Sequence, residues 1–274
     1  MKRLILFLSL MGLIGVFYAT LPHTKPMVVV CDVGQGDAIL ATYKNTQILF
    51  DVGPDNKKVL KCLENHMPFW DKTIEGVILS HGDSDHVGGL NDVMKLYKVK
   101  NFFSNGYLDK EIEQKISSKK ISQNDILSIS LFDFEVVWPD QNIENEGSAS
   151  SADKDGNENS VAGILTVPSI SSWQSWSMFL TGDIESEVEQ KLVWRGVLRQ
   201  DFGTLNVLKV SHHGSRTATS QELLDVLKPK VAVISVGKNN RFGHPTTEVL
   251  ERLKNIGAEI KRTDLNGEVI FDLN

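Results

Sequence analysis

SHGDSDHVGG, residues 80–89, follows the apolar run 76–79, which is typical of a buried strand. Within six positions this stretch carries four side chains that can bind metal: His81, Asp83, Asp85 and His86. Because imidazoles and carboxylates this crowded cannot all be solvated independently, we expect them to share a pair of divalent cations. A polar loop with an aspartate as helix N-cap is the simpler alternative, but capping accounts for one carboxylate and for neither histidine.

Outward from this stretch, β-branched and aromatic runs alternate with segments of helical spacing. The expected strands are 28–33, 38–43, 47–52, 76–80, 131–137, 161–167, 176–181, 207–210, 231–236, 259–262 and 268–272. The expected helices are 56–65, 90–97, 108–117, 184–194, 220–227 and 246–256. Strands come first as an antiparallel meander and then alternate with helices. Two mixed sheets packed face to face, with helices outside, satisfy this order in one α/β (α+β) domain over residues 27–274.

The composition is that of an ordinary globular protein, with 274 residues, 41% hydrophobic and 23% charged. The net charge of −6 excludes a global basic field of the kind that attracts nucleic acid. A local basic strip can still be drawn through Lys209, Arg216, Lys238 and Arg241. Solvated surface charge is the simpler interpretation of each lysine.

Residues 1–22 have the layout of a secretory signal or an uncleaved membrane anchor. Lys2 and Arg3 precede the apolar stretch 4–19, and 20–22 form a polar exit. The apolar run is short for a full membrane span, and it lacks a clean small-x-small cleavage site. Both interpretations place the remainder outside the cytoplasm, periplasmic or secreted, and both allow membrane association through this segment.

Two cysteines occur, Cys31 in a valine-rich strand and Cys62 in a segment of helical spacing. Pairing is open to them in an oxidising compartment. We expect buried free thiols instead, because both lie in apolar surroundings. Their separation excludes a zinc knuckle.

Further polar clusters follow apolar strands elsewhere in the chain. Thr181-Gly182-Asp183 ends one strand, Ser211-His212-His213-Gly214-Ser215 ends another, and Gly243-His244-Pro245 follows a third. Earlier carboxylates lie at strand ends in 32–37 (DVGQGD) and 50–53 (FDVG). The polar, acidic tract 140–159 predicts a loop. Clusters from both halves of the chain are therefore expected at one edge of the sandwich.

The ordered set DVGQGDA, FDVG, SHGDSDHVGG, TGD, LKVSHHGS and GHP resembles the metallo-β-lactamase fold superfamily. Within it the chain is most similar to the C-terminal extracellular domain of the ComEC/Rec2 competence proteins, in a stand-alone form. The resemblance covers about residues 28–272, nearly the whole mature chain. It implies an αββα sandwich of the metallo-β-lactamase type with two divalent metal ions.

The resemblance also implies a ligand set. His81 and Asp83 would hold one ion, and Asp85, His86 and either His212 or His213 the second, with Asp183 bridging them. Asp83 stands where the superfamily's His-x-His-x-Asp-His motif has its second histidine. A further histidine is replaced by an Asn-x-x-Ser element formed by Asn157 and Ser160. Fewer imidazoles and more oxygens shift the preference from Zn²⁺ toward Mn²⁺ without excluding Zn²⁺.

Other residues in the motifs have two interpretations each. Asp32, Gln35 and Asp37 either serve the metal site, with Asp37 orienting a ligand histidine, or make turn hydrogen bonds in a glycine-rich hairpin. Asp51 is expected to support the metal loop from below. His244 either protonates a leaving group and contacts phosphate, or simply precedes a proline that starts a helix. Phosphate or substrate contacts are also expected of Ser215, Arg216 and Arg241, for which plain surface is the alternative.

The implied function is a secreted or membrane-anchored binuclear hydrolase. We expect a phosphodiesterase or nuclease that acts on DNA through a metal-bridging hydroxide, with Asp85 and His244 as the catalytic residues. The DNA substrate follows by analogy with the competence domain. One alternative is hydrolysis of a small phosphoester, an ester or a lactam. Another is a non-catalytic accessory module of DNA uptake with structural metals. The sequence indicates no protein partner.

Overall fold

The computed structural model describes residues 24–106, 108–141, 156–169, 175–198 and 205–273, together with Phe7, Met11 and Gly12. The predicted signal or anchor, residues 1–22, otherwise lies outside these ranges, as do residues 142–155 of the predicted loop. No helix in the described ranges is long and apolar enough to cross a membrane.

The first sheet is built mainly from the N-terminal half of the chain. Among the described residues it has seven strands, in the order β16–β1–β2–β3–β5–β7–β8. These are β1 (Met27–Val30), β2 (Ile39–Tyr43), β3 (Thr46–Phe50), β5 (Gly76–Ile78), β7 (Phe102–Ser104), β8 (Ser118–Lys120) and β16 (Val269–Asp272). The expected meander is present, because β1, β2 and β3 pair antiparallel. From β3 onward the strands run parallel through β5 and β7 to β8.

The second sheet takes the later strands in the order β15–β14–β13–β12–β11–β10–β9, again seven within the described ranges. They are β9 (Ile126–Ile129), β10 (Phe132–Trp138), β11 (Ala162–Val167), β12 (Trp176–Leu180), β13 (Val207–Lys209), β14 (Val231–Ile234) and β15 (Glu259–Arg262). Pairing is antiparallel from β9 to β12 and parallel from β12 to β15. A small parallel pair, β4 (Thr73–Ile74) and β6 (Lys98–Val99), lies beside the first sheet.

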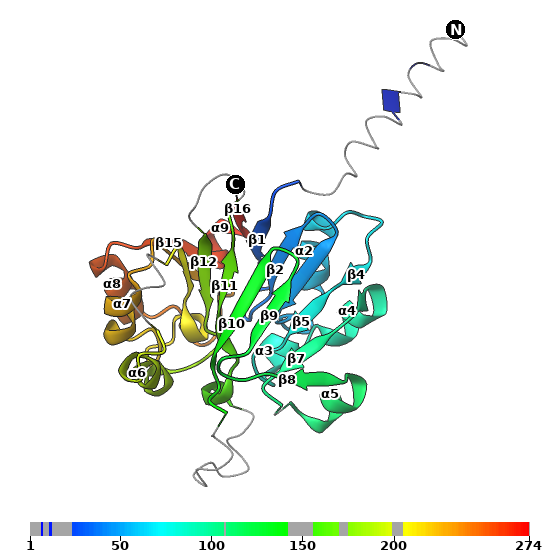
Figure 1. Cartoon of the computed structure of the whole chain (residues 1–274). Coiled ribbons are helices and arrows are strands. Elements are labelled where there is room, and N and C mark those ends of the chain that lie inside the picture. Colours follow the sequence, from blue (N-terminus) through cyan, green and yellow to red (C-terminus); the bar gives the residue numbers. More distant parts are fainter. Residues whose placement is uncertain are drawn as a thin grey trace.

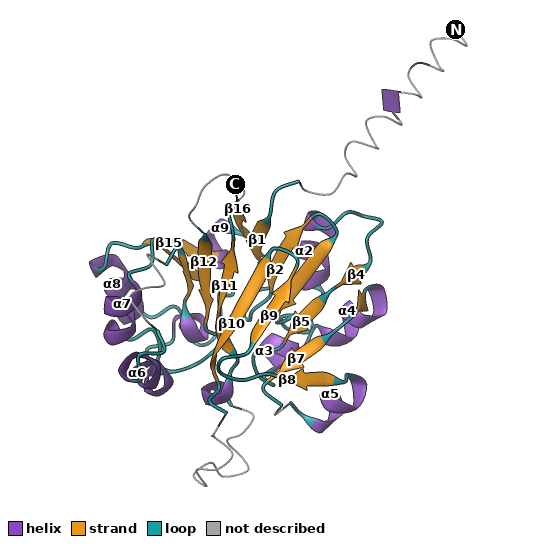
Figure 2. Cartoon of the chain, in the orientation of Figure 1, coloured by secondary structure: helices purple, strands orange, loops and turns teal. Residues whose placement is uncertain are grey.

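Helices cover the outer face of each sheet, so the molecule has four layers (Figures 1 and 2). The first sheet is covered by α2 (Lys58–His66), α4 (Leu90–Leu96) and α5 (Lys110–Lys115), and the second by α6 (Ser186–Trp194), α7 (Gln221–Leu227) and α8 (Thr247–Asn255). Short helices α3 (Ser84–Val87), α9 (Thr263–Asn266), η2 (Asn157–Asn159) and η4 (Ser211–Gly214) occupy loops. This is the predicted αββα sandwich.

Three hydrophobic cores fill the spaces between the layers. β1 shows the alternation that creates two of them, because Val29 joins the core under α2 and α4 while Val28 and Val30 join the core between the sheets. Phe50 and Phe134 meet in that central core, with ring centroids 5.0 Å apart. The third core lies between the second sheet and α6–α8. A strand buried on both faces reads as a continuous apolar run, which explains why Met27–Val30 shows no polar alternation.

The structure corrects the prediction for the two cysteines. Cys31 and Cys62 form a disulfide that joins the end of β1 to α2, with their Cα atoms 5.8 Å apart. Both residues are buried in the core between the first sheet and its helices. The sequence predicted free thiols because it placed one cysteine on a strand and the other on a helix. The packing of α2 against β1 brings those two elements together.

Removal of this disulfide should destabilise the protein. Replacing both cysteines by serine, or reducing them, frees a chain segment with a sequence separation of 31 residues. We expect the free energy of unfolding to fall by about 2–4 kcal/mol, since the cross-link restricts the unfolded chain. Urea denaturation with and without reductant measures this, and equal midpoints in both conditions would contradict the expectation.

Candidate metal centre

Polar loops follow the carboxyl ends of β1, β3 and β5 in one sheet and of β12, β13 and β14 in the other, and they meet at one edge of the sandwich, around α3 in Figure 1. Hydrogen bonds tie the two sheets together there. Val161 donates its backbone N–H to the carbonyl of Ser80 (2.7 Å), and Ser235 donates its hydroxyl to the carbonyl of Gly36 (2.7 Å). The site is therefore assembled from both halves of the chain, as expected.

Three imidazoles and one carboxylate converge at this edge with unpartnered atoms. The Nε2 atoms of His81, His86 and His213 and Oδ1 of Asp183 are buried, and none has a hydrogen-bond partner among the described residues. Buried polar atoms almost always have a partner, so four unpartnered atoms in one place indicate a missing binding partner. Ligand atoms of His81, His86 and Asp183 lie within 4.8 Å of one another, and so do those of Asp85, His86 and His213. The donor set fits divalent metal ions.

The opposite nitrogen of each histidine is held in place by the protein. Asp51 accepts from Nδ1 of His86 at 2.8 Å, and the carbonyl of Ser235 accepts from Nδ1 of His213 at 2.8 Å. Nδ1 of His81 lies 3.0 Å from the hydroxyl of Ser80. A carbonyl and a carboxylate can only accept hydrogen bonds. His86 and His213 therefore each carry a proton on Nδ1, on the side of the ring that is turned away from the shared centre. This tautomer directs the Nε2 lone pairs toward the shared centre.

Carboxylates give the centre a field that favours positive charge. Asp183 lies between two imidazoles, its Oδ2 being 3.3 Å from Nε2 of His86 and 3.5 Å from Nε2 of His213. Burial alone would raise the pKa of Asp183, but His213 and His86 hold it well below its usual value. Burial likewise acts to lower the pKa of His86, and the carboxylates of Asp183 and Asp51 reverse this and raise it well above its usual value. The same field would stabilise a bound cation.

Asp85 supplies a further donor beside His86 and His213. Its Oδ2 lies 3.3 Å from Nε2 of His213, and its side chain is 29% exposed. Burial opposes ionisation of Asp85, but the neighbouring imidazoles of His213 and His86 outweigh it and lower its pKa to about 2. Asp85 is therefore an anionic oxygen donor across the physiological pH range.

Asp83 and His212 lie at the open side of the centre. Asp83 Oδ2 is 3.6 Å from Nε2 of His81, and its side chain is 56% exposed. The ring of His212 has Nε2 3.9 Å from Asp183 and Nδ1 3.1 Å from Glu185. His213 is the more deeply buried of the pair. Both histidines have left-handed backbones, with φ of 46° and 53°, a strained conformation that points successive rings into one site.

The residues of the loop 32–37 differ in their contacts, so each of their two interpretations applies to some of them. Asp32 accepts a turn hydrogen bond from the backbone N–H of Gly34 (3.2 Å), and Gln35 accepts from Gly237 (3.4 Å). Asp37 instead lies behind the ring of His213, with Oδ1 3.6 Å from its Nδ1. Gly36, at φ 129°, lets this loop touch the metal loop, because a Cβ there would collide with the carbonyl of Asp85.

Other predicted residues lie around the centre at different depths. Ser160 is buried, 3.3 Å from Nδ1 of His81, and Asn157 lies 3.3 Å from Nδ1 of His212. His244 stands beside His212, with ring centroids 5.7 Å apart. Arg216 is not brought into the cluster, because its side chain is 74% exposed and pairs with Glu248. The remaining predicted residues, Ser215 and Arg241, contact Thr217 and Phe242.

The environment of His244 disfavours its charged form. Burial lowers the pKa of His244, and the neighbouring His212 and His213 lower it further. Its Nδ1 is buried and has no hydrogen-bond partner among the described residues. The neutral imidazole therefore has an unused polar atom beside the metal centre.

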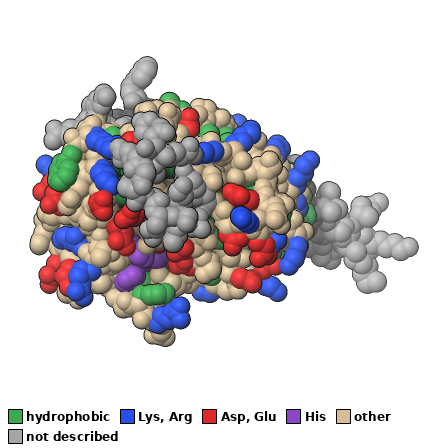
Figure 3. Space-filling view, turned by 90° about the horizontal axis from the view of Figure 1, so that it is seen from below, with side chains coloured by type: hydrophobic (Ala, Val, Ile, Leu, Met, Phe, Trp, Pro, Cys, Tyr) green, Lys and Arg blue, Asp and Glu red, His purple; other side chains and the backbone are tan. Residues whose placement is uncertain are grey.

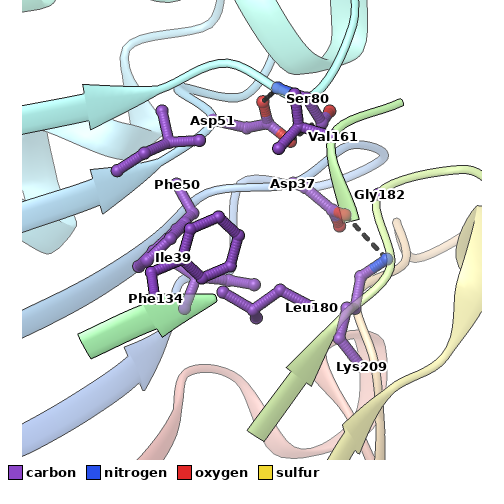
Figure 4. Close-up of a pocket in the computed structure, with 11 residues that line it drawn as sticks. Asp37, Ile39, Phe50, Asp51, Ser80, Phe134, Val161, Leu180, Gly182 and Lys209 are labelled. Carbon is purple, nitrogen blue, oxygen red and sulfur yellow. Dashed lines mark hydrogen bonds and ion pairs between the residues drawn. The ribbon is translucent and has the colours of Figure 1, made fainter. Parts of the chain in front are cut away.

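The prediction that Lys209 lies on the surface is wrong. This lysine is fully buried beneath the centre, so it does not belong to an exposed basic strip. Its Nζ lies 2.6 Å from Asp37 Oδ2 and donates to the carbonyl of Val210 at 3.0 Å (Figure 4). The pair borders a cavity of about 20 Å³ between the sheets, the size of one water molecule. A lysine inside the apolar run 207–210 was the available signal for a buried partner.

Loss of the lysine alone should cost more than loss of the pair. Lys209→Met leaves Asp37 buried without its counter-ion, and we expect the free energy of unfolding of the metal-free protein to fall by about 3–5 kcal/mol. The double variant Lys209→Met/Asp37→Asn should recover part of that loss, since no uncompensated charge remains. Urea denaturation of the three proteins gives the comparison. A single variant as stable as the wild type would show that the ion pair contributes nothing.

Comparison with known proteins agrees with this geometry. Residues 31–111 match the metallo-beta-lactamase superfamily. ComE operon protein 3 of Bacillus subtilis is 29% identical over 88% of this chain and 32% of its own length, and Recombination protein 2 of Haemophilus influenzae is 28% identical over 87% and 28%. The predicted resemblance to competence proteins is confirmed. The chain spans about a third of the length of these relatives.

Solved structures show the same fold at low sequence identity. The metallo-beta-lactamase fold protein YhfI from Bacillus subtilis superposes with a TM-score of 0.58 at 12% identity, covering 90% of this chain and 99% of that one. CmlA, a diiron beta-hydroxylase from Streptomyces venezuelae, gives 0.59 at 11% identity, covering 92% and 55%. The αββα prediction is thereby confirmed. The superfamily match supports a metal-dependent hydrolase, with histidine and aspartate donors placed for metal binding.

Proposed function

We propose that this domain is an extracytoplasmic, binuclear metal-dependent phosphodiesterase that hydrolyses DNA. The observation that carries the proposal is the convergence of the unpartnered Nε2 atoms of His81, His86 and His213 on the carboxylate of Asp183. Structural metal sites tend to have closed coordination, whereas catalytic ones keep an open position. The exposed carboxylate of Asp83 lies on the side where this cluster opens to solvent.

Two divalent ions, Mn²⁺ or Zn²⁺, fit the donors in the following assignment. His81 and Asp83 would hold one ion and Asp85, His86 and His213 the other, and Asp183 would be shared by both. We prefer His213 to His212 because its Nε2 is within 3.5 Å of both Asp85 and Asp183, whereas Nε2 of His212 is 3.9 Å from Asp183. Bound ions would supply activation of water and neutralisation of charge on the phosphodiester.

The protein's own groups then orient the reactants. Asp51 and Ser235 fix the rings of His86 and His213, so these ligands lose little freedom on binding. His244 lies beside His212 at the open side, where its neutral imidazole contacts the phosphate. Its lowered pKa disfavours the alternative role of proton donor to the leaving group. Arg216 has no part in this scheme, since it pairs with Glu248 on the surface.

DNA is the proposed substrate because Recombination protein 2 is named for recombination, and because another similar protein, Competence protein ComA of Neisseria gonorrhoeae, is named for competence. An extracytoplasmic location is supported by the Cys31–Cys62 disulfide, since structural disulfides persist in oxidising compartments. The apolar stretch 4–19, with Lys2 and Arg3 before it, fits export or anchoring at the membrane.

The central test removes two of the proposed metal ligands, Asp85 and His86. The full chain, purified in mild detergent, should bind two divalent ions and hydrolyse single- or double-stranded DNA and bis(p-nitrophenyl) phosphate with Mn²⁺ or Zn²⁺. Asp85→Ala/His86→Ala should lose more than about 100-fold in activity, because changes to groups that merely orient ligands already cost 10–100-fold. Asp225→Asn, an exposed carboxylate on α7, is the matched control. Full activity in the double variant, or turnover of only a small phosphocholine ester or a lactam, would refute the proposal.

A milder change tests the orienting role of Asp51. Asp51 has a left-handed backbone, with φ of 56°, which asparagine tolerates. Asp51→Asn removes the negative charge that holds the Nδ1 proton of His86. We expect metal affinity to weaken by about 10–100-fold, as measured by calorimetric titration with Mn²⁺. Unchanged affinity in this variant would mean that Asp51 supports the loop without tuning the ligand.

A further inference from the structure

The loop between β14 and α8 presents an aromatic side chain at the mouth of the metal centre. Phe242 is 54% exposed and belongs to none of the hydrophobic clusters of the described residues. Its ring stacks on that of His244, with centroids 5.9 Å apart and planes inclined by 26°. His244 in turn meets His212 at 5.7 Å. The three rings form a row that leads from solvent to the metal centre.

A cation accompanies this exposed ring. The guanidinium carbon of Arg241 lies 5.1 Å from the centroid of Phe242. In the space-filling view from below, hydrophobic and basic side chains sit beside the histidines at this end of the molecule (Figure 3). Single exposed apolar residues are normal on protein surfaces. An aromatic ring that stacks on a histidine of the site and carries an arginine is a more specific arrangement.

The loop is held rigidly in this shape by Asn240. Its side-chain amide donates to the carbonyls of Gly237 (3.1 Å) and His244 (2.7 Å), and its oxygen accepts from the backbone N–H of Phe242 and of His244, both at 3.1 Å. The far end of the loop is tied to the histidine loop, because Thr246 donates its backbone N–H to the carbonyl of Gly214 at 3.0 Å. Phe242 is therefore presented in a fixed position, which reduces the entropy lost on binding a ligand.

We propose that Phe242 and Arg241 form a nucleobase-binding subsite, in which the base beside the scissile phosphodiester takes the place of the Arg241 guanidinium on the Phe242 ring, and the released guanidinium contacts the adjacent phosphate. This proposal rests on the proposed function and narrows it to a substrate class. Bases inside a duplex are already stacked on their neighbours, so only an unpaired base is free to reach the ring. The preferred substrate is thus a single strand or a frayed end. Guanidinium and phosphate pair in a bidentate manner, which fixes the strand beside the stacked base.

The test compares oligonucleotides with and without a base to stack. Binding of fluorescently labelled dT12 and of an abasic strand of the same length is measured by anisotropy on the full chain, with Ca²⁺ present. Wild-type protein should bind dT12 more tightly by about 5- to 150-fold, the range expected for one stacked base. In Phe242→Ala this difference should disappear, and in Phe242→Trp it should persist. Phe69→Ala removes another exposed phenylalanine, 66% exposed and outside the sequence motifs of the metal centre, and is the matched control.

The outcomes separate the subsite from the proposed hydrolysis. Equal affinity of wild-type protein for the two strands, or a Phe242→Ala variant that keeps the preference for dT12, would overturn the subsite, whatever the nuclease activity. A base-dependent preference that is lost in Phe242→Ala supports the subsite even if no phosphodiester is hydrolysed, in which case the proposed function fails alone. Where DNA is hydrolysed, Phe242→Ala should raise the KM for single-stranded DNA more than it lowers kcat, since stacking acts on substrate binding.

Discussion

The carboxylate of Asp51 is the point on which the metal centre depends. It accepts the backbone N–H of Ser80 at 2.7 Å, the hydroxyl of Ser80 at 2.7 Å and Nδ1 of His86 at 2.8 Å. The first bond joins the end of β3 to the end of β5, and the others fix two neighbouring groups of the metal loop. Since the Ser80 hydroxyl is committed to Asp51 as a donor, it can accept from Nδ1 of His81. One buried carboxylate therefore sets the tautomer of His86 and leaves the Ser80 hydroxyl as an acceptor beside His81.

A second constraint joins the sheets to each other. Asp37 comes from the first sheet and Lys209 from the second, and their buried ion pair spans the interface beneath the metal centre. Asp37 also faces Nδ1 of His213, so the position of a ring in the second sheet depends on a loop of the first. Burying two charges is expensive, and separating them leaves an uncompensated buried charge. The pair therefore penalises any shift that would draw the Asp37 loop away from Lys209.

The sequence was sufficient for the fold and for the members of the cluster, but not for their connections. Periodicity predicts the longer strands because both faces of 28–30 and 207–210 are buried, whereas short pairs such as β4 and β6 carry too few residues to show a pattern. The order of the motifs predicted that His81, Asp183 and His213 lie at one edge of the sandwich. It could not show that Cys31 and Cys62 are adjacent, because this depends on how α2 packs on β1. Lys209 was misjudged for a similar reason, since a lysine reads as exposed until its partner is seen.

The side chains of the cluster differ in their exposure to solvent, so a substrate can reach the cluster only from its exposed side. His86 and His213 are buried and held by buried partners, while the side chains of Asp83, Asp85 and His212 are 56%, 29% and 25% exposed. The row of rings from His212 through His244 to Phe242 begins on that open side. An exposed carboxylate binds a cation more weakly than an enclosed imidazole set, because water competes for both partners. If the site holds two ions as proposed, the one beside Asp83 would thus be the more exchangeable.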